Sequence, residues 1–404
     1  MKKTNLEITT MLNEMDDHDQ LGVVIVLNNK CKATHVSELC PLQRTDQPTY
    51  HLREIHQITG RFCPKTIRHL MEHSDVEYIC PDYSVRSNLN VATATIGAKH
   101  TNQFHGLTGK GITVSVIDTG IFPHYDLTYP TNRIVGFQDF VNSRTTPYDD
   151  NGHGTHVAGA IAGNGSASGG NYSGIAPEAN VVGVKVLDSQ GNGLLSNVIA
   201  GINWSIENRS RFGIRVINLS LGAPPTTSYV NDPLALACEK AWRAGIVVVA
   251  AAGNSGPNGT IDTPGYDPII LTVGATNDRN TIHEQDDTPG EYTSSKPTLD
   301  GFIKPDIAVP GTNIISLQSP NSTTTIQQPQ NKVGPHYFTL TGTSMATGIV
   351  SGIVALLLQA SPPYTPDTVK VRLMESSKFL TPQFTGYSFV TSLFNMTRNY
   401  HKTD

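Results

Sequence analysis

The sequence lacks an excess of basic residues: 29 Lys and Arg stand against 34 Asp and Glu, which gives a formal net charge of −5 at pH 7. Proteins that bind nucleic acid need Lys and Arg to neutralise phosphates, so we expect no nucleic-acid partner. A long apolar segment is also missing, because the longest uncharged apolar run, residues 348–360, is shorter than the ~20 residues needed to cross a bilayer. We therefore expect no membrane association.

Cysteine is scarce, and its spacing matches no known type of site. The five cysteines are an odd number and show neither CxxC spacing nor a companion HxxxH pattern for zinc. This pattern predicts reduced thiols in a reducing compartment. The first twenty residues open with Lys2 and Lys3, but Glu7 and Glu14 follow where a signal peptide has its apolar stretch. We expect a cytoplasmic protein, and the sequence leaves export by another route open.

The 404 residues are too many for one average domain and favour two or three. Short β-branched runs near the N-terminus predict strands, and the segment after Cys63-Pro64 has the apolar spacing of a helix. We therefore place a small α+β unit at residues 21–82, after an N-terminal extension at 1–20. The polar residues 83–104 predict a linker.

Apolar strands alternate with helices in the main domain, which we place at residues 105–378. Strands are predicted at 112–118, 180–187, 216–221, 246–254 and 269–275, and helices at 196–207 and 233–244. Buried strands that alternate with helices predict an α/β fold with a mostly parallel sheet covered on both faces. Functional side chains of such folds gather at the carboxyl edge of the sheet. Residues 379–404 are predicted to form a C-terminal appendage.

Two motifs place candidate catalytic side chains at this edge. Asp118 directly follows the apolar strand VSVI, although many α/β proteins keep an aspartate there for a metal, a ribose or a structural hydrogen bond. The segment DDNGHGTHVAGAIAG contains His153 and His156 among glycines that allow close approach of the backbone, with a helix behind them. The base of a catalytic triad would fit here.

Two further motifs supply a nucleophile and a hydrogen-bond donor. Ser344 lies at the start of the long apolar helix in GTSMATGIVSGIVALLL, where unpaired backbone N–H groups would help to hold a developing oxyanion. The structural alternative is an N-capping serine. Asn254 follows a buried strand in VVVAAAGNSG, so its side-chain amide would donate to the same oxyanion. The alternative for Asn254 is an ordinary turn residue.

These motifs carry a resemblance to a known family. The segments VIDTGI, HGTHVAG, AAGN and GTSMA, together with INLSLG, TPG and KPDIAVPG, resemble the subtilisin-like serine proteases over about residues 105–375. The chain looks most like the intracellular, signal-less alkaline proteases of the bacillus type, and the order Asp, His, Ser is that of subtilisin. The resemblance implies a subtilisin-like fold and a serine endopeptidase that cleaves extended or unfolded polypeptides through an acyl-enzyme.

The resemblance also implies roles for individual residues. His153, the first histidine of HGTH, would be the general base, and Asp118 would orient it. Ser344 would be the nucleophile, and Asn254 would donate to the oxyanion. An extended peptide would bind as an added strand. The residues expected to bind it are Gly191, Gly193, Leu195, Val198, Ser220, Leu221, Gly222, Ala251, Ala252, Gly253 and Asp262. Of these, Asp262 would either favour Lys or Arg before the cut or be a solvated loop residue.

The small unit at 21–82 resembles the propeptide of many subtilisin-like proteases. The resemblance implies that it assists folding, inhibits the enzyme as its own partner, and is removed by autoprocessing between about Tyr83 and His100. No cofactor is required for the chemistry, but the family often binds calcium. Asp126 falls where the family has a calcium-binding aspartate, whereas the loop GNGSASGGNYSG lacks a carboxylate-rich ligand set.

The sequence departs from the family pattern at two places. Gly348-Ile349 stand where the family usually has Pro-His, and the second of two family glycines is replaced after Gly386. A second interpretation is therefore a subtilisin-like fold that serves as a binding protein, because Gly348 misplaces Ser344. A third, a nucleotide-binding α/β protein suggested by GLTGKG at 106–111, is disfavoured because its glycines precede a strand instead of linking strand to helix.

Overall fold

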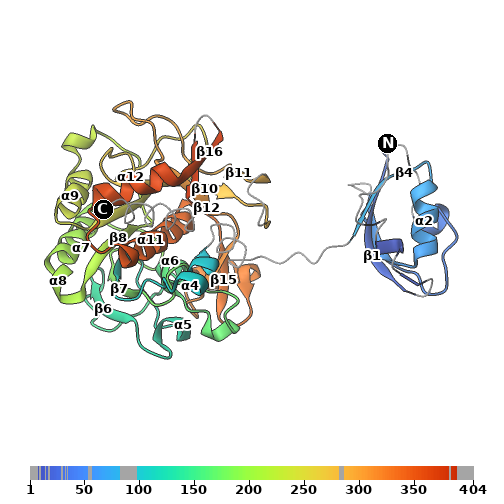
Figure 1. Cartoon of the computed structure of the whole chain (residues 1–404), viewed down its shortest axis with the longest axis horizontal. Coiled ribbons are helices and arrows are strands. Elements are labelled where there is room, and N and C mark those ends of the chain that lie inside the picture. The colour runs from blue at the N-terminus through green and yellow to red at the C-terminus, as the bar shows by residue number, and fades with distance from the viewer. Residues whose placement is uncertain are drawn as a thin grey trace, which may run out of the picture. The chain divides into compact units, whose positions relative to one another are not determined.

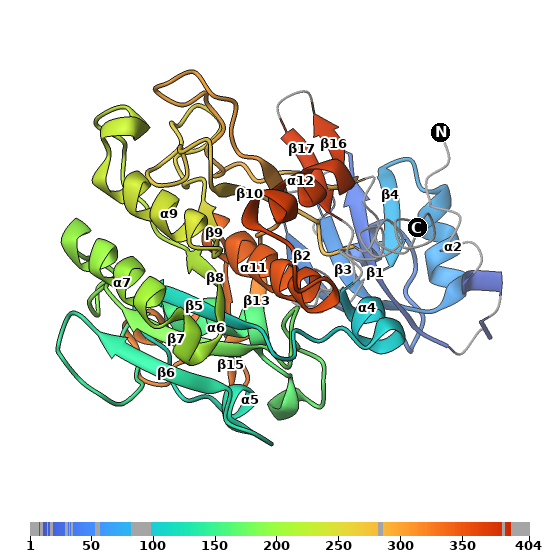
Figure 2. The same cartoon turned by 60° about the vertical axis from the view of Figure 1, so that its left-hand side comes forward.

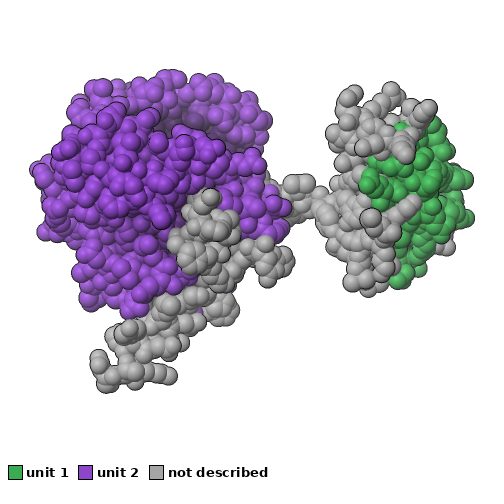
Figure 3. All heavy atoms as spheres, turned by 90° about the horizontal axis from the view of Figure 1, so that it is seen from above, with its two compact units in different colours: residues 1–86 green, residues 87–404 purple. Residues whose placement is uncertain are grey.

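The structure of the chain is a computed structural model that describes residues 8, 11–13, 15–16, 19–28, 31, 33, 35–52, 57–81, 98–281, 286–381 and 384–388. The chain divides into two compact units (Figures 1 and 3), which we call unit 1 (residues 1–86) and unit 2 (residues 87–404). The boundary lies within the predicted linker at 83–104. Most of that linker, with the predicted processing site, lies outside the described residues.

Unit 1 contains a four-stranded antiparallel sheet in the order β2-β3-β1-β4, and helix α2 lies against it (Figure 1). Its elements are β1 (Leu21–Leu27), β2 (Gln47–Leu52), β3 (Gln57–Phe62), α2 (Pro64–Glu72) and β4 (Val76–Pro81). Ile67 and Leu70, one turn apart on α2, are fully buried and pack with the apolar face of the sheet.

The core of unit 1 begins earlier in the chain than the sequence indicated. Ile8 and Leu12 are almost fully buried in the same apolar cluster as Ile25 of β1. The predicted extension at 1–20 therefore contributes to the core. Ile8, Met11, Leu12 and Met15 have the i, i+3, i+4, i+7 spacing of a helix with one apolar face, so the signal was present in the sequence.

The central sheet of unit 2 has the order β11-β10-β9-β8-β5-β7-β6, and β12 pairs with β10. Its strands are β5 (Thr113–Asp118), β6 (Ile134–Asp139), β7 (Asn180–Lys185), β8 (Ile214–Leu219), β9 (Val247–Ala251), β10 (Leu271–Asn277), β11 (Thr288–Pro289) and β12 (Ile307–Pro310). Every pairing is parallel except β10 with β11. All residues of β5 and β9 are buried, as expected for strands covered on both faces. The predicted mostly parallel α/β fold is confirmed.

Helices lie on both sides of this sheet. They are α4 (Ala98–His105), α5 (Tyr125–Thr128), α6 (His153–Ala162), α7 (Leu195–Glu207), α8 (Arg209–Phe212), α9 (Pro233–Arg243), α10 (Thr323–Gln327), α11 (Thr343–Ala360) and α12 (Pro366–Ser376). α6 packs against α11, and α7 packs against α9 (Figure 2). The sequence determines where α9 begins. The Asp232 carboxylate accepts hydrogen bonds from the N–H groups of Leu234 and Ala235, and Pro233 takes the first position of the helix.

Helix α11 is the one helix of the described chain that is long and apolar enough to cross a membrane. Its residues from Thr343 to Leu358 are buried inside unit 2. It is therefore explained as the core helix of this unit.

Two segments differ from the sequence-based domain boundaries. α4 begins within the predicted linker, and its Ala98 and Thr101 are fully buried. After α12, the predicted appendage begins with the hairpin β16 (Ser377–Thr381) and β17 (Phe384–Ser388), and residues 389–404 lie outside the described residues. A further small sheet, β13-β15-β14, joins Ile314–Leu317, Tyr337–Leu340 and Lys332–Val333.

Candidate active site

The four residues expected to carry catalysis all lie at ends of secondary-structure elements. Asp118 is the last residue of β5, and His153 is the first of α6. Ser344 is the second residue of α11, while Asn254 follows the end of β9. The strands β5 and β9 are in one parallel sheet, so their carboxyl ends reach the same edge.

Asp118 and His153 are in direct contact. His153 Nδ1 lies 2.8 Å from Asp118 Oδ1, and the Asp118 side chain is fully buried. Burial opposes protonation of His153, but the charge of Asp118 and its hydrogen bond outweigh this, so the pKa of His153 is raised. The contact fixes Nδ1 as the protonated nitrogen, which leaves Nε2 as the acceptor.

Close approach of α6 to β5 requires a glycine at position 154. A Cβ atom there would lie 2.2 Å from the carbonyl oxygen of Gly120 and 3.2 Å from Asp118 Oδ1. The glycine thus lets the first turn of α6 reach the end of β5, where His153 meets Asp118.

A second carboxylate, Asp149, supports this pair and was not singled out from the sequence. Its Oδ1 accepts from Thr119 Oγ1 and from the N–H groups of Asn151 and Gly152, and its Oδ2 accepts from Thr155 N and Oγ1, over distances of 2.6–3.1 Å. Asp149 therefore ties the chain after Asp118 to the first turn of α6. The signal was present in the sequence, since Asp149 opens the motif that contains His153.

Ser344 and Asn254 meet at the start of α11. The N-cap of this helix is Gly342, so Ser344 is not the capping serine of the structural alternative. Asn254 Oδ1 accepts from Thr343 N at 2.9 Å and from Thr343 Oγ1 at 3.1 Å. This leaves Asn254 Nδ2 and the N–H of Ser344, one of the unpaired groups of the first helical turn, as donors. The Ser344 hydroxyl itself donates to the carbonyl oxygen of Ser220 at 3.0 Å.

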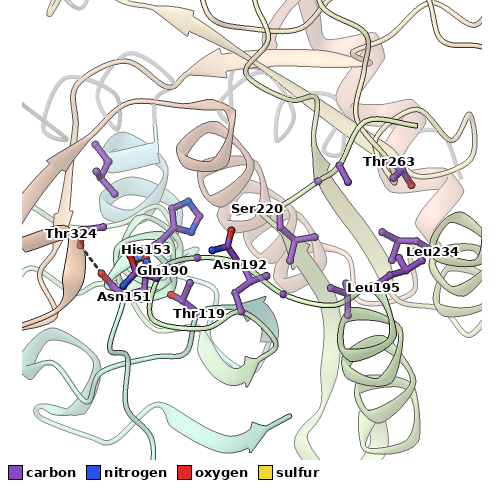
Figure 4. Close-up of a pocket in the computed structure, with 18 of the residues that line it drawn as sticks. Thr119, Asn151, His153, Gln190, Asn192, Leu195, Ser220, Leu234, Thr263 and Thr324 are labelled. Carbon is purple, nitrogen blue, oxygen red and sulfur yellow. Dashed lines mark hydrogen bonds between the residues drawn. The ribbon is translucent and has the colours of Figure 1, made fainter. Parts of the chain in front are cut away.

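Two cavities adjoin these residues and share the segment Ser220–Gly222. The larger, about 600 Å³, is lined by His153 and by the expected Gly191, Gly193, Leu195 and Val198. Figure 4 shows His153 and Asn151 near one end of it, Ser220 in the middle, and Leu195 with Leu234 at the other end. The smaller cavity, about 290 Å³, is lined by Ser344, Asn254, Ala251, Gly253 and Asp262.

One expected substrate-binding residue lies elsewhere. Ala252 is fully buried and packs with Ala235, Ile261 and Tyr266, away from both cavities. The reason is the alternation of an extended segment: Ala251 faces the cavity, so the next side chain points to the opposite face.

The prediction of a calcium ligand at Asp126 does not fit the structure. Both carboxylate oxygens already accept protein hydrogen bonds, Oδ1 from Ala167 N and Oδ2 from Tyr337 Oη, each at 2.7 Å. Within the described residues, no group of three or more Asp, Glu, His or Cys side chains is placed to hold a metal ion. Asp126 instead joins α5 to β15.

His156, the second histidine of the motif, makes contacts that give it a structural role. It is buried, and its Nε2 lies 3.0 Å from the carbonyl oxygens of both Ile314 and Phe338. Burial lowers the pKa of His156 to about 3, so the ring is neutral and Nε2 carries the hydrogen. It joins α6 to two strands of the small sheet.

The departure at Gly348 leaves α11 intact. The helix runs without a break from Thr343 to Ala360, and Ile349 is fully buried in the core. A Cβ atom at Gly348 would lie 3.3 Å from the carbonyl oxygen of Val157 and 3.4 Å from Ala160 Cβ, so α6 packs closely here.

Comparisons with known proteins point in one direction. The model of the subtilase family, peptidase S8, matches residues 109–397. Serine protease AprX of Bacillus subtilis (strain 168) is 43% identical over 368 residues, which cover 88% of this chain and 83% of AprX. Subtilisin E of the same organism is 35% identical over 326 residues, covering 79% of this chain and 75% of that protein. The crystal structure of a cold adapted subtilisin-like serine proteinase matches with a TM-score of 0.54 and 30% identity, over 70% of this chain and 89% of that one.

Proposed function

The chain belongs to the subtilase family and is a subtilisin-type serine protease, and we propose that its catalytic triad is Asp118, His153 and Ser344. The observation that carries the proposal is the 2.8 Å contact between His153 Nδ1 and the buried Asp118 carboxylate. It prepares Nε2 of His153 to take a proton from Ser344, whose helix start also provides an oxyanion donor.

The reaction begins when the Ser344 hydroxyl turns from the Ser220 carbonyl toward His153. Ser344 Oγ attacks the peptide carbonyl while His153 Nε2 takes its proton, and Asp118 stabilises the imidazolium. The N–H of Ser344 and the side-chain amide of Asn254 hold the negative oxygen. His153 then gives the proton to the leaving amine, and water hydrolyses the acyl-enzyme by the same steps.

We infer that the substrate is an extended polypeptide bound between the segments 191–195 and 220–222. Both segments line the larger cavity, and backbone recognition there would tolerate many sequences. The apolar Leu195 and Val198 line the same cavity and suit an apolar side chain upstream of the cut. The end of this cavity that lies far from His153 is therefore the proposed pocket for the upstream side chain.

The triad is tested by Ser344→Ala, which should abolish casein hydrolysis and labelling by a fluorophosphonate. Labelling also separates an active protease from a binding protein with the same fold. A companion pair distinguishes the histidines: His153→Ala should be inactive, whereas His156→Ala should lose stability but keep activity per folded molecule. An active Ser344→Ala protein would refute the assignment, and a folded, inactive His156→Ala protein would reverse the choice of base.

We also propose that unit 1 is a propeptide that inhibits unit 2 and is cleaved from it by the enzyme itself. The support is its separate apolar core, which lets it fold as one body. Mass spectrometry should find the wild type cut between about Tyr83 and His100 and the Ser344→Ala variant uncut. Segment 1–94, added separately, should inhibit the mature enzyme, and a lack of inhibition would leave unit 1 as an extension without this role.

A further inference from the structure

A segment distant in sequence lies on the loop that leads to His153. We call it the α10 segment: it comprises residues 319–324 and runs from just after β13 into the first turn of α10. Ser319 Oγ donates to the carbonyl oxygen of Asp149 at 2.6 Å, and the Ser319 side chain is buried. This hydrogen bond is therefore shielded from water, and it joins the α10 segment to the residue that supports the start of α6.

Thr324 makes the main contact of the α10 segment. Its N–H and its Oγ1 both donate to the carbonyl oxygen of Asn151, at 3.0 and 2.7 Å (Figure 4). Thr323 N donates to the carbonyl oxygen of Asp150, one residue earlier, at 2.9 Å. The three consecutive carbonyl groups of residues 149–151 therefore all have donors in the α10 segment.

The close approach of the two segments requires a glycine at position 152. Gly152 is the N-cap of α6 and has a φ of 104°, in the left-handed region that favours glycine. A Cβ atom there would lie 2.4 Å from Thr324 Oγ1 and 2.6 Å from Ser322 Oγ. Hydroxyl groups of the α10 segment thus fill the space of a side chain directly before His153.

The α10 segment is linked to both residues between which the proton passes. On one side, Asn151 Oδ1 accepts from His153 N at 3.2 Å, so a shift of Asn151 would move the first residue of α6. On the other side, the chain continues from α10 through β14 and β15 into α11, which carries Ser344. His153 and Ser344 belong to different helices, and a proton passes between them only within hydrogen-bond reach. Their separation therefore depends on contacts such as those of the α10 segment.

We propose that Ser319 and Thr324 are positioning residues of the protease. Their hydroxyl groups hold the loop 149–151 in the place from which His153 Nε2 reaches Ser344 Oγ. The inference rests on the proposed catalytic triad. A misplacement of about 1 Å can lower the rate of such a reaction about 100-fold, so a small shift of the loop is measurable.

The test must separate positioning from contact with substrate, because Thr324 also lines the larger cavity. Thr324→Val removes the hydroxyl and keeps the shape of the side chain, whereas Thr324→Ser keeps the hydroxyl. Thr324→Val should lower kcat for a tetrapeptide p-nitroanilide about 5- to 20-fold with little change of KM. Labelling by a small fluorophosphonate, which needs the base but no bound peptide, should slow by the same factor. Thr324→Ser should restore both rates.

Ser319→Ala is the second variant, and it tests the same role at a residue that does not line the larger cavity. It should also lower kcat and the labelling rate, and the double variant Ser319→Ala/Thr324→Val should be slower than either single variant. If Thr324→Val fails to fold, Ser319→Ala alone provides the comparison. Active-site titration with the label gives the concentration of folded enzyme, so that loss of folded protein is not counted as a lower kcat.

Thr325→Val is the matched control. Thr325 is the next residue of α10, and its buried Oγ1 donates to the carbonyl oxygen of Ser322 at 2.9 Å, within the helix region and not to the loop 149–151. The substitution removes the same group from the same helix. We expect Thr325→Val to lower stability and to leave kcat and the labelling rate of the folded enzyme unchanged.

The outcomes separate failure of this inference from failure of the proposed function. If Thr324→Val raises KM but is labelled at the wild-type rate, Thr324 contacts the substrate and does not position His153. If Thr325→Val slows labelling as much as Thr324→Val, the effect is one of stability and the positioning role is refuted. If the wild type itself takes no fluorophosphonate label, the proposed triad fails, and the inference fails with it.

Discussion

Replacing Asp149 by asparagine tests whether a second carboxylate sets the basicity of His153. Asp149 accepts five hydrogen bonds, three on Oδ1 and two on Oδ2. Asparagine keeps one oxygen for the first three donors, but its NH₂ group then faces the N–H of Thr155, which loses its partner. A buried N–H without a partner costs about 1–3 kcal/mol. Burial raises the pKa of Asp149 in spite of these donors, so loss of the charge itself adds no further cost.

We therefore expect Asp149→Asn to lower the free energy of unfolding by about 1–3 kcal/mol. Chemical denaturation should be followed in the Ser344→Ala background, which prevents self-digestion. The charge of Asp149 also contributes to the raised pKa of His153, after the larger effects of burial, which opposes it, and of Asp118. Because the base must be neutral to act, removal of the charge should move the acid limb of kcat/KM to lower pH.

The neighbouring residue provides a matched control. Asp150 carries the same charge, but its side chain is partly exposed and pairs with Lys185 Nζ at 2.7 Å. Asp150→Asn should leave the acid limb in place. If Asp149→Asn also leaves it in place, or moves it to higher pH, then the charge of Asp149 does not act on His153 and its role is confined to stability.

Two further substitutions test the packing of unit 2. Burial raises the pKa of Asp267 to about 6, and its Oδ2 has no hydrogen-bond partner among the described residues. The fold therefore loses stability as pH rises through 6, because the buried carboxyl group ionises. Denaturation should show that Asp267→Asn raises the free energy of unfolding by about 2–3 kcal/mol at pH 8 and has little effect at pH 4. Gly348→Pro should raise the free energy of unfolding by about 0.4–1 kcal/mol without loss of turnover. Proline has no N–H for the Ser344 carbonyl one turn earlier, but this carbonyl keeps Ser220 Oγ as a donor at 2.9 Å. Lower stability and turnover would show that the close contact with Val157 dominates.

The parts of the fold that the sequence predicted are those in which local pattern and burial agree. The strands β5 and β9 are runs of β-branched and small apolar residues, because both faces of the sheet are covered. β6 was not predicted although it begins with the short apolar run of residues 134–137, and in the structure only its end residues, Ile134 and Asp139, are buried. α4 was missed because it is short and polar; among its described side chains, Ala98 and Thr101 are buried.

The sequence predicted the part of the candidate site that follows from the order of strands and helices along the chain. Asp118 and His153 come from elements whose ends meet at one edge of the sheet, and the structure brings them to 2.8 Å. The direction of a side chain was harder to predict: Ala251 and Ala252 have the same local composition, but only one faces the cavity. The alternation of an extended chain would have predicted that difference.

Three aspartates of the site illustrate how partners, and not residue type, determine roles. Asp118 is paired with His153, so its charge supports the imidazolium. Asp149 accepts hydrogen bonds from hydroxyl and N–H donors at the start of α6, so its carboxylate is fully used within the protein. Asp262 has no such partner and faces a cavity. The sequence presents all three as aspartates near glycines, and nothing local separates them. Because only the third charge lacks a protein partner, it alone is available to a substrate, and a change of specificity is therefore expected from Asp262 and not from the other two.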